Sequence, residues 1–294
     1  MKYMRDNLED KYGLLLLQDK ILEIAVYIEK FCTEHDIDYC LMGGSALGAK
    51  RHGGFIPWDD DLDIFMTPDN YEKFREKFAE FGDHEKFYLQ EYGRTKKGHV
   101  TVPKLRMNGT TYLEELTKDW DIHEGIFVDI FILHNCPKSR IKRRWQYFWA
   151  KCAVVKGLSM RGYNRQKGLK KFLVCLSKIL PKRLMVDFAL KQVYRYRNSK
   201  SDYYCNFLGK AGYKKGLYKK EWFSKTEHVP FEQTELRTPI GLHEFLTERF
   251  GDYMTPPSEE RIKWEQHAMK WDTENDFSVY VNQARDFSDE RYLV

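Results

Sequence analysis

A short acidic string limits most strongly what this 294-residue chain can fold into. The segment Ile56-Pro57-Trp58-Asp59-Asp60-Asp61-Leu62-Asp63-Ile64 places four carboxylates within five positions and sets apolar side chains among them. Like charges repel, and a carboxylate away from water is poorly solvated, so such a cluster is costly unless a cation neutralises it. A solvated acidic turn is the alternative, and the interleaved apolar residues disfavour it.

The spacing of the carboxylates predicts how they are arranged. Residues 62–66 alternate as a strand would, and Asp61 and Asp63 are two positions apart. Both side chains are therefore expected on one face, where they can share hard divalent ions through oxygen ligands. Asp59 and Asp60 precede the strand and are expected to orient the loop or to lie behind the ligands.

A glycine-rich turn about 16 residues earlier supplies a complementary feature. The apolar run 39–42 ends in Gly43-Gly44-Ser45, which is typical of a strand that leads through a tight turn into a helix. Glycines let backbone N–H groups approach a phosphate, a helix starting at Ser45 adds its positive dipole end, and the hydroxyl can donate to a phosphate oxygen. Lys50 and Arg51 add positive charge nearby. A phosphate cradle beside paired carboxylates indicates metal-assisted phosphoryl transfer.

A third carboxylate is expected to complete a two-metal site. Asp129 is the one acid inside the apolar run 125–131, which makes it the natural candidate. Two alternatives stay open at this point. Asp129 can be an ordinary buried, hydrogen-bonded acid, and Lys104 and Arg106 can be surface charges on a strand.

Periodicity predicts an α+β, or mixed α/β, catalytic core of about 135 residues. An amphipathic helix is expected over residues 8–35, and a second helix begins at the cap Thr67-Pro68 and runs to about Phe81. Further strands are expected at residues 87–90, 100–106, 110–113 and 126–133. Residues 137–200 predict two or three helices joined near Gly162 and Pro181, and a helix is expected at 242–250. The chain thus divides into a core (1–136), a basic and mainly helical insertion (137–200), and a helical or irregular C-terminal region packed on the core (201–294).

These motifs resemble the nucleotidyltransferase superfamily, whose pattern is a Gly-Gly/Ser turn, a downstream Asp-x-Asp on a strand, and a third Asp on an adjacent strand. More narrowly, residues 47–51 and the string 54–64 look like the LicD family of phosphorylcholine transferases, related to fukutin-type sugar-phosphate transferases. The match continues through residues 104–106 and 125–131, and more loosely through 250–257. The resemblance implies a nucleotidyltransferase-like core with a short mixed sheet flanked by helices.

The resemblance also implies a reaction and a set of roles. The reaction is transfer of phosphocholine from CDP-choline to a sugar hydroxyl of a cell-surface polysaccharide, lipopolysaccharide or teichoic-acid precursor, with release of CMP. Two Mg²⁺ ions, or Mn²⁺ in their place, are expected. The implied metal ligands and catalytic residues are Asp61, Asp63 and Asp129, with Asp129 also helping to deprotonate the acceptor. The implied donor-binding residues are Gly43, Gly44, Ser45, Arg51 and Lys104, the last neutralising charge on the leaving nucleotide.

Three points leave the function open. Leu133-His134-Asn135 lacks the proline and acidic residue that often follow this strand in the family, which leaves the acceptor unidentified. A related enzyme could transfer ribitol phosphate or glycerol phosphate from a CDP-linked donor, and a protein of another class could be an inert scaffold that retains the fold. Choline binding would need an aromatic cage, for which Trp58 and Trp120 are candidates.

Charge is distributed very unevenly along the chain. Residues 138–200 contain 19 Lys and Arg but one acid, Asp187, so this segment carries +18 while the rest carries −13 and the whole +5. Three interpretations are open: nucleic-acid binding, a surface that docks an anionic membrane or a phosphate-rich, lipid-linked acceptor, and a solvated face packed on the acidic core. Membrane or acceptor docking is favoured because it fits a transferase that acts on a lipid-linked glycan.

The sequence also predicts a compartment. No run of 18 apolar residues is present, and acidic residues stand where a signal peptide needs basic and apolar ones. A cytoplasmic protein, peripheral on the inner face of the membrane, is expected. Six scattered cysteines with no Cys-x-x-Cys pair argue against a zinc knuckle or a dithiol redox site.

Overall fold

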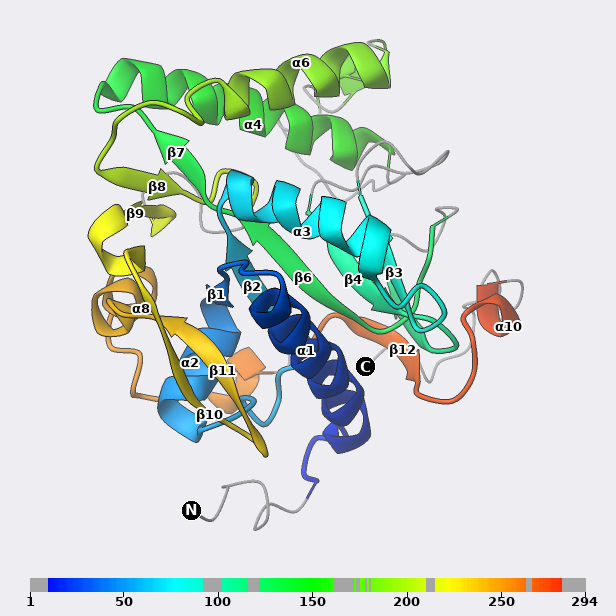
Figure 1. The fold of residues 1–294 in the computed structure, drawn as a ribbon. Coiled ribbons are helices and arrows are strands. Elements are labelled where there is room, and N and C mark those ends of the chain that lie inside the picture. The colour runs from blue at the N-terminus through cyan, green and yellow to red at the C-terminus, as the bar shows by residue number, and fades with distance from the viewer. Residues whose placement is uncertain are drawn as a thin grey trace.

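A five-stranded mixed sheet organises the protein, which has an α+β fold (Figure 1). The computed structural model describes residues 10–91, 102–115, 122–160, 172, 175–177, 179, 181–209, 215–262 and 266–281. The strands of this sheet, in spatial order, are β1 (Cys40–Leu41), β2 (Asp63–Met66), β6 (Phe127–Ile132), β4 (Lys104–Met107) and β3 (Phe87–Gln90). β2 and β6 run parallel, and the other neighbours are antiparallel.

Two helices cover one face of this sheet. α1 (Leu15–Glu34) buries an apolar stripe with helical spacing, and α3 (Pro68–Phe81) begins at Thr67, whose hydroxyl accepts a hydrogen bond from the Asn70 N–H at 3.3 Å. Tyr27 of α1 contacts Phe87 of β3, with ring centroids 4.3 Å apart. The same tyrosine meets Phe78 of α3, so both helices and the sheet share one core.

α2 (Gly43–His52) follows β1 without an intervening loop. It starts two residues before Ser45, the expected first residue, because Gly43 takes a left-handed backbone conformation (φ +55°) that turns the chain at once. The Gly53-Gly54 turn after α2 is held by Glu232, whose backbone N–H donates to the Gly53 carbonyl and whose carboxylate accepts from the Phe55 N–H. The C-terminal region therefore fixes the entry to the acidic string.

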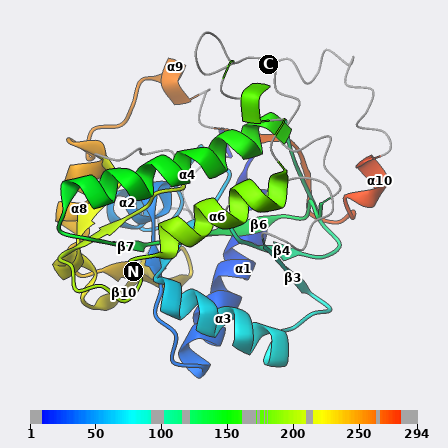
Figure 2. The same ribbon diagram turned by 90° about the horizontal axis from the view of Figure 1, so that it is seen from above.

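The basic segment forms an antiparallel helical hairpin, seen from above in Figure 2. Its arms are α4 (Arg140–Met160) and α6 (Lys182–Tyr194), as the sequence predicted, with Pro181 at the start of α6. Gly162, the other expected joint, lies outside the described residues. The hairpin packs on a three-stranded sheet of β7 (His134–Cys136), β8 (Tyr203–Cys205) and β9 (Leu217–Lys219).

The C-terminal region contains more strand than the sequence predicted. α8 (Leu242–Phe250) lies where it was expected, and the short helices η2 (Lys220–Phe223), α9 (Glu259–Ile262) and α10 (Ser278–Val281) accompany it. In addition, β10 (Thr226–Phe231) and β11 (Thr234–Pro239) form a hairpin, and β12 (Ala268–Asp272) pairs with β5 (Thr111–Glu114) of the core. The β10–β11 turn uses Glu232 at φ +52° in place of the usual Gly or Asn, so no turn residue marks this hairpin in the sequence.

The C-terminal region packs into the core cluster through Phe231, Leu236 and Phe245, among others. The division of the chain into three domains stays a prediction. In the described part of the chain, no helix has the length and apolar character that crossing a membrane requires.

Candidate active site

Strand register brings the three central site residues together. Asp63, the first residue of β2, is the register partner of Asp129 on β6, and Asp129 is in turn the partner of Lys104 on β4. Side chains at the same register position of neighbouring strands point to the same face. Asp63, Asp129 and Lys104 therefore form a row across three strands, although they lie far apart in sequence.

This row points away from the face that α1 and α3 cover. Phe87, which contacts α1, is the register partner of Met107, so Met107 points to the α1 side. Side chains alternate along a strand, and Lys104 is three positions from Met107. Lys104 and its partners consequently project from the opposite face of the sheet.

An ion pair occupies the centre of the row. The Lys104 ammonium lies 2.8 Å from Asp129 Oδ1 and 3.8 Å from Glu114 Oε2, and it sits over the Phe127 ring at 3.3 Å from the centroid. Lys104 and Asp129 each expose 14% of their side chains. Burial raises the pKa of Asp129 above its ordinary value, although Lys104 acts in the opposite direction. The environment of Asp129 thus penalises a negative charge that one lysine only partly compensates.

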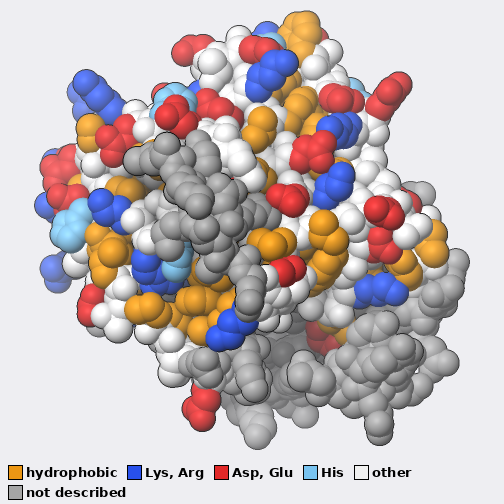
Figure 3. Space-filling model, turned by 90° about the horizontal axis from the view of Figure 1, so that it is seen from below, with side chains coloured by type: hydrophobic (Ala, Val, Ile, Leu, Met, Phe, Trp, Pro, Cys, Tyr) orange, Lys and Arg blue, Asp and Glu red, His pale blue; other side chains and the backbone are white. Residues whose placement is uncertain are grey.

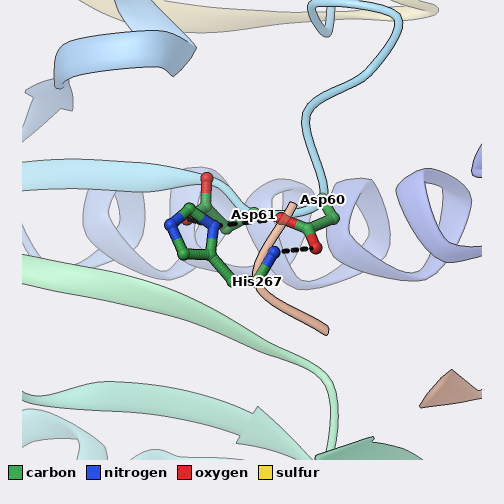
Figure 4. A group of neighbouring side chains, drawn as sticks. All are labelled: Asp60, Asp61 and His267. Atoms are coloured by element: carbon green, nitrogen blue, oxygen red, sulfur yellow. Dashed lines mark hydrogen bonds and ion pairs between the residues drawn. The ribbon is translucent and has the colours of Figure 1, made fainter. Parts of the chain in front are cut away.

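Asp60 and Asp61 lie close to His267, which belongs to the C-terminal region (Figure 4). Asp60 is almost fully buried and accepts hydrogen bonds from the backbone N–H groups of His267 (2.6 Å) and Ala268 (2.8 Å). His267 Nδ1 lies 3.2 Å from Asp60 Oδ1 and 3.5 Å from Asp61 Oδ2. Asp60 therefore anchors β12, as a residue behind the ligands would, while Asp61 remains partly exposed.

Tyr112 of β5 connects the two carboxylate groups. Burial raises the pKa of its hydroxyl well above the ordinary value, and the nearby carboxylates of Asp60, Asp61 and Glu114 raise it further. The tyrosine is therefore neutral and lies near carboxylates of both groups.

The N-terminus of α2 lies against the carboxylates. The Asp63 N–H donates to Ser45 Oγ at 2.8 Å, and the Met42 N–H donates to the Asp63 carbonyl at 2.9 Å. A Cβ on Gly44 would lie 2.7 Å from Asp59 Oδ2, and one on Gly43 would lie 3.7 Å from Asp63 Oδ2. Glycines at 43 and 44 thus let the helix start close to the acidic string, and donor binding by this turn, including Ser45, stays a prediction.

Arg51 lies on the last turn of α2, away from the helix start. Its guanidinium donates to the Tyr253 carbonyl at 3.0 Å and sits 5.9 Å from the centroid of the Trp58 ring. Trp58 is itself buried and packs edge-on against Tyr12 and His52, so its ring belongs to the core. These two contacts tie the end of α2 to its surroundings, and binding of donor phosphate by Arg51 stays a prediction. Trp120, the other candidate for a choline cage, lies outside the described residues.

Sequence reasoning missed three residues of this region. Glu114 ends β5 one position beyond the expected strand, and His267 lies in a part expected to be irregular. For Arg106, the alternative of a surface charge is wrong, because the side chain is buried and donates to Gln90 Oε1 (2.9 Å) and the Gly125 carbonyl (2.7 Å). The alternation of Lys104 and Arg106 in an apolar strand was the one signal that could have placed Arg106 inside.

The donor set fits a hard divalent cation. Asp61, Asp63 and Asp129 offer carboxylate oxygens, which Mg²⁺ and Mn²⁺ prefer, and the burial of Asp129 creates a need for positive charge. Asp61, Asp63 and Asp129 stay the predicted ligands, and among the described residues Asp60, Asp61 and His267 also bring possible ligand atoms within 4.8 Å of one another.

The sequence of this region is similar to that of known proteins. Residues 36–156 match the model of the LicD/FKTN/FKRP nucleotidyltransferase domain. The chain is 30% identical over 252 residues to the lipopolysaccharide cholinephosphotransferase LicD of Haemophilus influenzae, which covers 82% of this chain and 91% of that protein. A shorter match, 48% identical over 42 residues, links it to the human ribitol 5-phosphate transferase FKRP, covering 14% of this chain and 8% of that protein.

The matched range contains β1, α2, the acidic string, Lys104 and Asp129, which are the parts that build the row of charged residues. The similarity to the Haemophilus protein extends over most of both chains. The chain therefore belongs to the LicD/FKTN/FKRP family of nucleotidyltransferase-domain enzymes.

Proposed function

We propose that this protein transfers phosphocholine from CDP-choline to a sugar hydroxyl of a cell-surface glycan precursor and releases CMP. The observation that carries the proposal is the register pairing of Asp63 with Asp129, beside Asp61 and the start of α2. Similarity to a lipopolysaccharide cholinephosphotransferase over most of the chain supports phosphocholine as the transferred group.

Magnesium is the cofactor we propose, held by Asp61, Asp63 and Asp129. When bound, divalent ions stabilise negative charge on the phosphate oxygens and align the reacting groups. The protein's own contribution is to hold the carboxylates in register on two adjacent strands and to direct the N–H groups of α2 toward the same region.

The acceptor hydroxyl attacks the phosphorus that carries choline. A new P–O bond forms, the P–O bond of the pyrophosphate breaks, and CMP leaves with the electron pair. The hydroxyl proton must be removed, and we assign this to Asp129, because burial raises its pKa and makes it a stronger base than an exposed aspartate. Lys104, beside Asp129, supplies positive charge near the developing negative charge.

Transfer of ribitol phosphate from a CDP-linked donor is the second candidate. The local match to a ribitol 5-phosphate transferase favours it, but that match spans 42 residues, compared with 252 for the cholinephosphotransferase. The same carboxylates would act in both reactions, so donor recognition separates them.

Donor binding and turnover test the proposal together. With Mg²⁺ present, CDP-choline is expected to raise the melting temperature more than CDP-ribitol or CDP-glycerol does. Adding choline-free lipopolysaccharide or teichoic-acid precursor should release CMP and attach choline to the glycan. A larger shift in melting temperature with CDP-ribitol would favour the second candidate. If none of the donors releases CMP, both candidates are rejected and an inert scaffold is favoured.

A variant tests the metal assignment. Asp63→Ala should reduce turnover by about 1000-fold or more, because the developing charge loses its stabilisation, while the cooperative melt is retained. The Mg²⁺-dependent shift in melting temperature should disappear as well. Glu248→Ala, at an exposed carboxylate of α8, serves as the control and should match the wild type. Near-wild-type activity of Asp63→Ala would show that Asp63 is not a ligand.

A further inference from the structure

The outer side of the α4–α6 hairpin carries exposed apolar side chains at helical spacing. Ile141, Trp145 and Phe148 recur on α4, and Leu184 and Phe188 are four residues apart on α6. Their exposed fractions run from 45% at Phe188 to 80% at Ile141. Residues three or four apart lie on one side of a helix, so each helix presents an apolar stripe to solvent.

The two stripes join into one surface. Trp149 contacts Phe148 of its own helix at 5.2 Å between centroids and Phe188 of α6 at 4.7 Å. The Trp145 indole N–H donates to Gln192 Oε1 at 3.4 Å across the same junction. We call the five exposed apolar residues and the aromatic junction between them the hairpin surface.

The opposite side of the hairpin is buried and packs against the rest of the protein. Small apolar residues are buried there, including Ala150 and Ala153 of α4 and Ala189 and Val193 of α6. Gln146 is also buried and donates to the carbonyls of Val193 (2.9 Å) and Asn135 (3.1 Å), which ties both helices to β7. The hairpin therefore packs on the protein through its inner side, and the hairpin surface is left over.

Cations flank the hairpin surface. Arg140, Lys142 and Arg144 of α4 and Lys191 of α6 are exposed, and none of them forms an ion pair with another residue that the structure describes. The surrounding segment, residues 138–200, carries +18. On the opposite face of the molecule, Asp and Glu side chains lie among the Lys and Arg side chains, so charges of both signs are mixed there (Figure 3).

We infer that the hairpin surface binds the surface of an anionic phospholipid bilayer. Aromatic side chains favour the boundary between headgroups and acyl chains, aliphatic side chains enter the apolar layer, and Lys and Arg attract anionic headgroups. Nucleic acid would leave the highly exposed Ile141 and Leu184 without an apolar partner. A second copy would bring two strongly basic segments together, which charge repulsion opposes.

Vesicle sedimentation tests the inference on the full-length protein. At low salt, the protein should bind vesicles of phosphatidylcholine containing about one third phosphatidylglycerol and bind pure phosphatidylcholine at least about 10-fold more weakly. High salt should weaken binding to the anionic vesicles, because it screens the headgroup charge. Failure to sediment with anionic vesicles at low salt overturns the inference, and so does equal binding to both vesicle types.

Two triple variants separate the apolar and the charged contributions. Ile141→Ser/Trp145→Ser/Phe148→Ser should weaken binding about 10-fold or more. Lys142→Gln/Arg144→Gln/Lys191→Gln should weaken it on the order of 100-fold, because each cation near the surface contributes separately. All six side chains are exposed, so both variants should melt like the wild type.

Matched controls change equally exposed residues elsewhere. Phe81→Ser/Ile240→Ser/Val279→Ser and Lys30→Gln/Lys219→Gln/Lys225→Gln should bind vesicles like the wild type. If the controls lose as much affinity as the hairpin variants, binding is unspecific and the inference fails. The inference also fails if the protein is a dimer and only the triple serine variant of the hairpin surface is a monomer. It fails as well if duplex DNA, at equal phosphate concentration, displaces the protein from anionic vesicles.

Discussion

At the scale of single residues, the Lys104–Asp129 ion pair joins two register partners at the centre of the candidate site. A buried carboxylate resists ionisation, and the ammonium 2.8 Å away makes ionisation easier. The pKa of Asp129 is therefore higher than that of an exposed aspartate, although the positive charge of Lys104 lies beside its carboxylate. This balance suits a residue that we propose as both metal ligand and base.

Replacing Lys104 by Met tests this balance, because Met keeps the apolar stem and removes the charge. The pKa of Asp129 should rise further once the ammonium is gone. A base acts in its deprotonated form, so the acidic limb of the pH profile of kcat/KM should move to higher pH, with a loss of roughly 10-fold at neutral pH. Lys30→Met, at an exposed lysine of α1, is the control. An acidic limb that stays in place would separate Asp129 from the proton transfer.

At the scale of secondary-structure elements, a second charged cluster joins α1 to the β10–β11 hairpin. Glu29 of α1 accepts hydrogen bonds from Tyr39 Oη (2.7 Å) and from the Arg237 guanidinium of β11 (3.0 Å), and His228 Nε2 of β10 lies 3.1 Å away. Burial alone would raise the pKa of Glu29, but the hydrogen bonds from Tyr39, Arg237, His228 and Thr33 outweigh it and lower the pKa to about 2. The cluster holds the hairpin whose Glu232 fixes the turn before the acidic string.

Glu29→Gln should lower the free energy of unfolding at neutral pH by about 2 kcal/mol, since it weakens a partly buried ion pair. The folded-state pKa lies below the unfolded value, so Glu29 contributes its full stability above pH 4.5 and loses it as the pH falls toward 2. Urea unfolding at several pH values should show the wild type and the variant converging in acid. A difference that is the same at pH 7 and pH 3 would contradict this account.

At the scale of the whole molecule, the C-terminal region completes the site. Asp60 accepts hydrogen bonds from the backbone N–H groups of His267 and Ala268. In addition, β12 pairs with β5, which carries Glu114. The hydrogen bonds of Asp60 connect residues 207 and 208 positions apart in the sequence. The site is therefore assembled only when both ends of the chain have folded together.

Asp60→Ala should release β12 from the acidic string. Two buried N–H groups lose their acceptor, which should cost about 2 kcal/mol in the free energy of unfolding. Hydrogen exchange at the His267 and Ala268 amides should become roughly 10-fold faster or more, and transferase activity should fall. Asp252→Ala, at an exposed aspartate, is the control. Unchanged exchange at the β12 amides would show that Asp60 does not hold this strand.

Local features were predictable because they depend on neighbours in sequence. The cap at Thr67-Pro68, the helix 242–250 and the strand 87–90 all lie where periodicity and turn residues place them. The strands of the C-terminal region were not predicted, because β10 and β11 carry charged residues and turn at Glu232 without a glycine. Their pairing depends on burial against α1 and α2, which a local pattern does not reveal.

By itself, the sequence determined which chemical groups lie close together in the chain: four carboxylates within five positions, a glycine turn before them, a third acid in an apolar strand, and a strongly basic segment. Only the tertiary structure decided that Asp129 lies in register with Asp63, that Lys104 and Glu114 face it, that Arg106 is buried, and that β12 returns to Asp60. The physical reason is range. Helix caps and side-chain alternation arise within a few residues, whereas strand register and desolvation are set by packing among segments far apart in the chain.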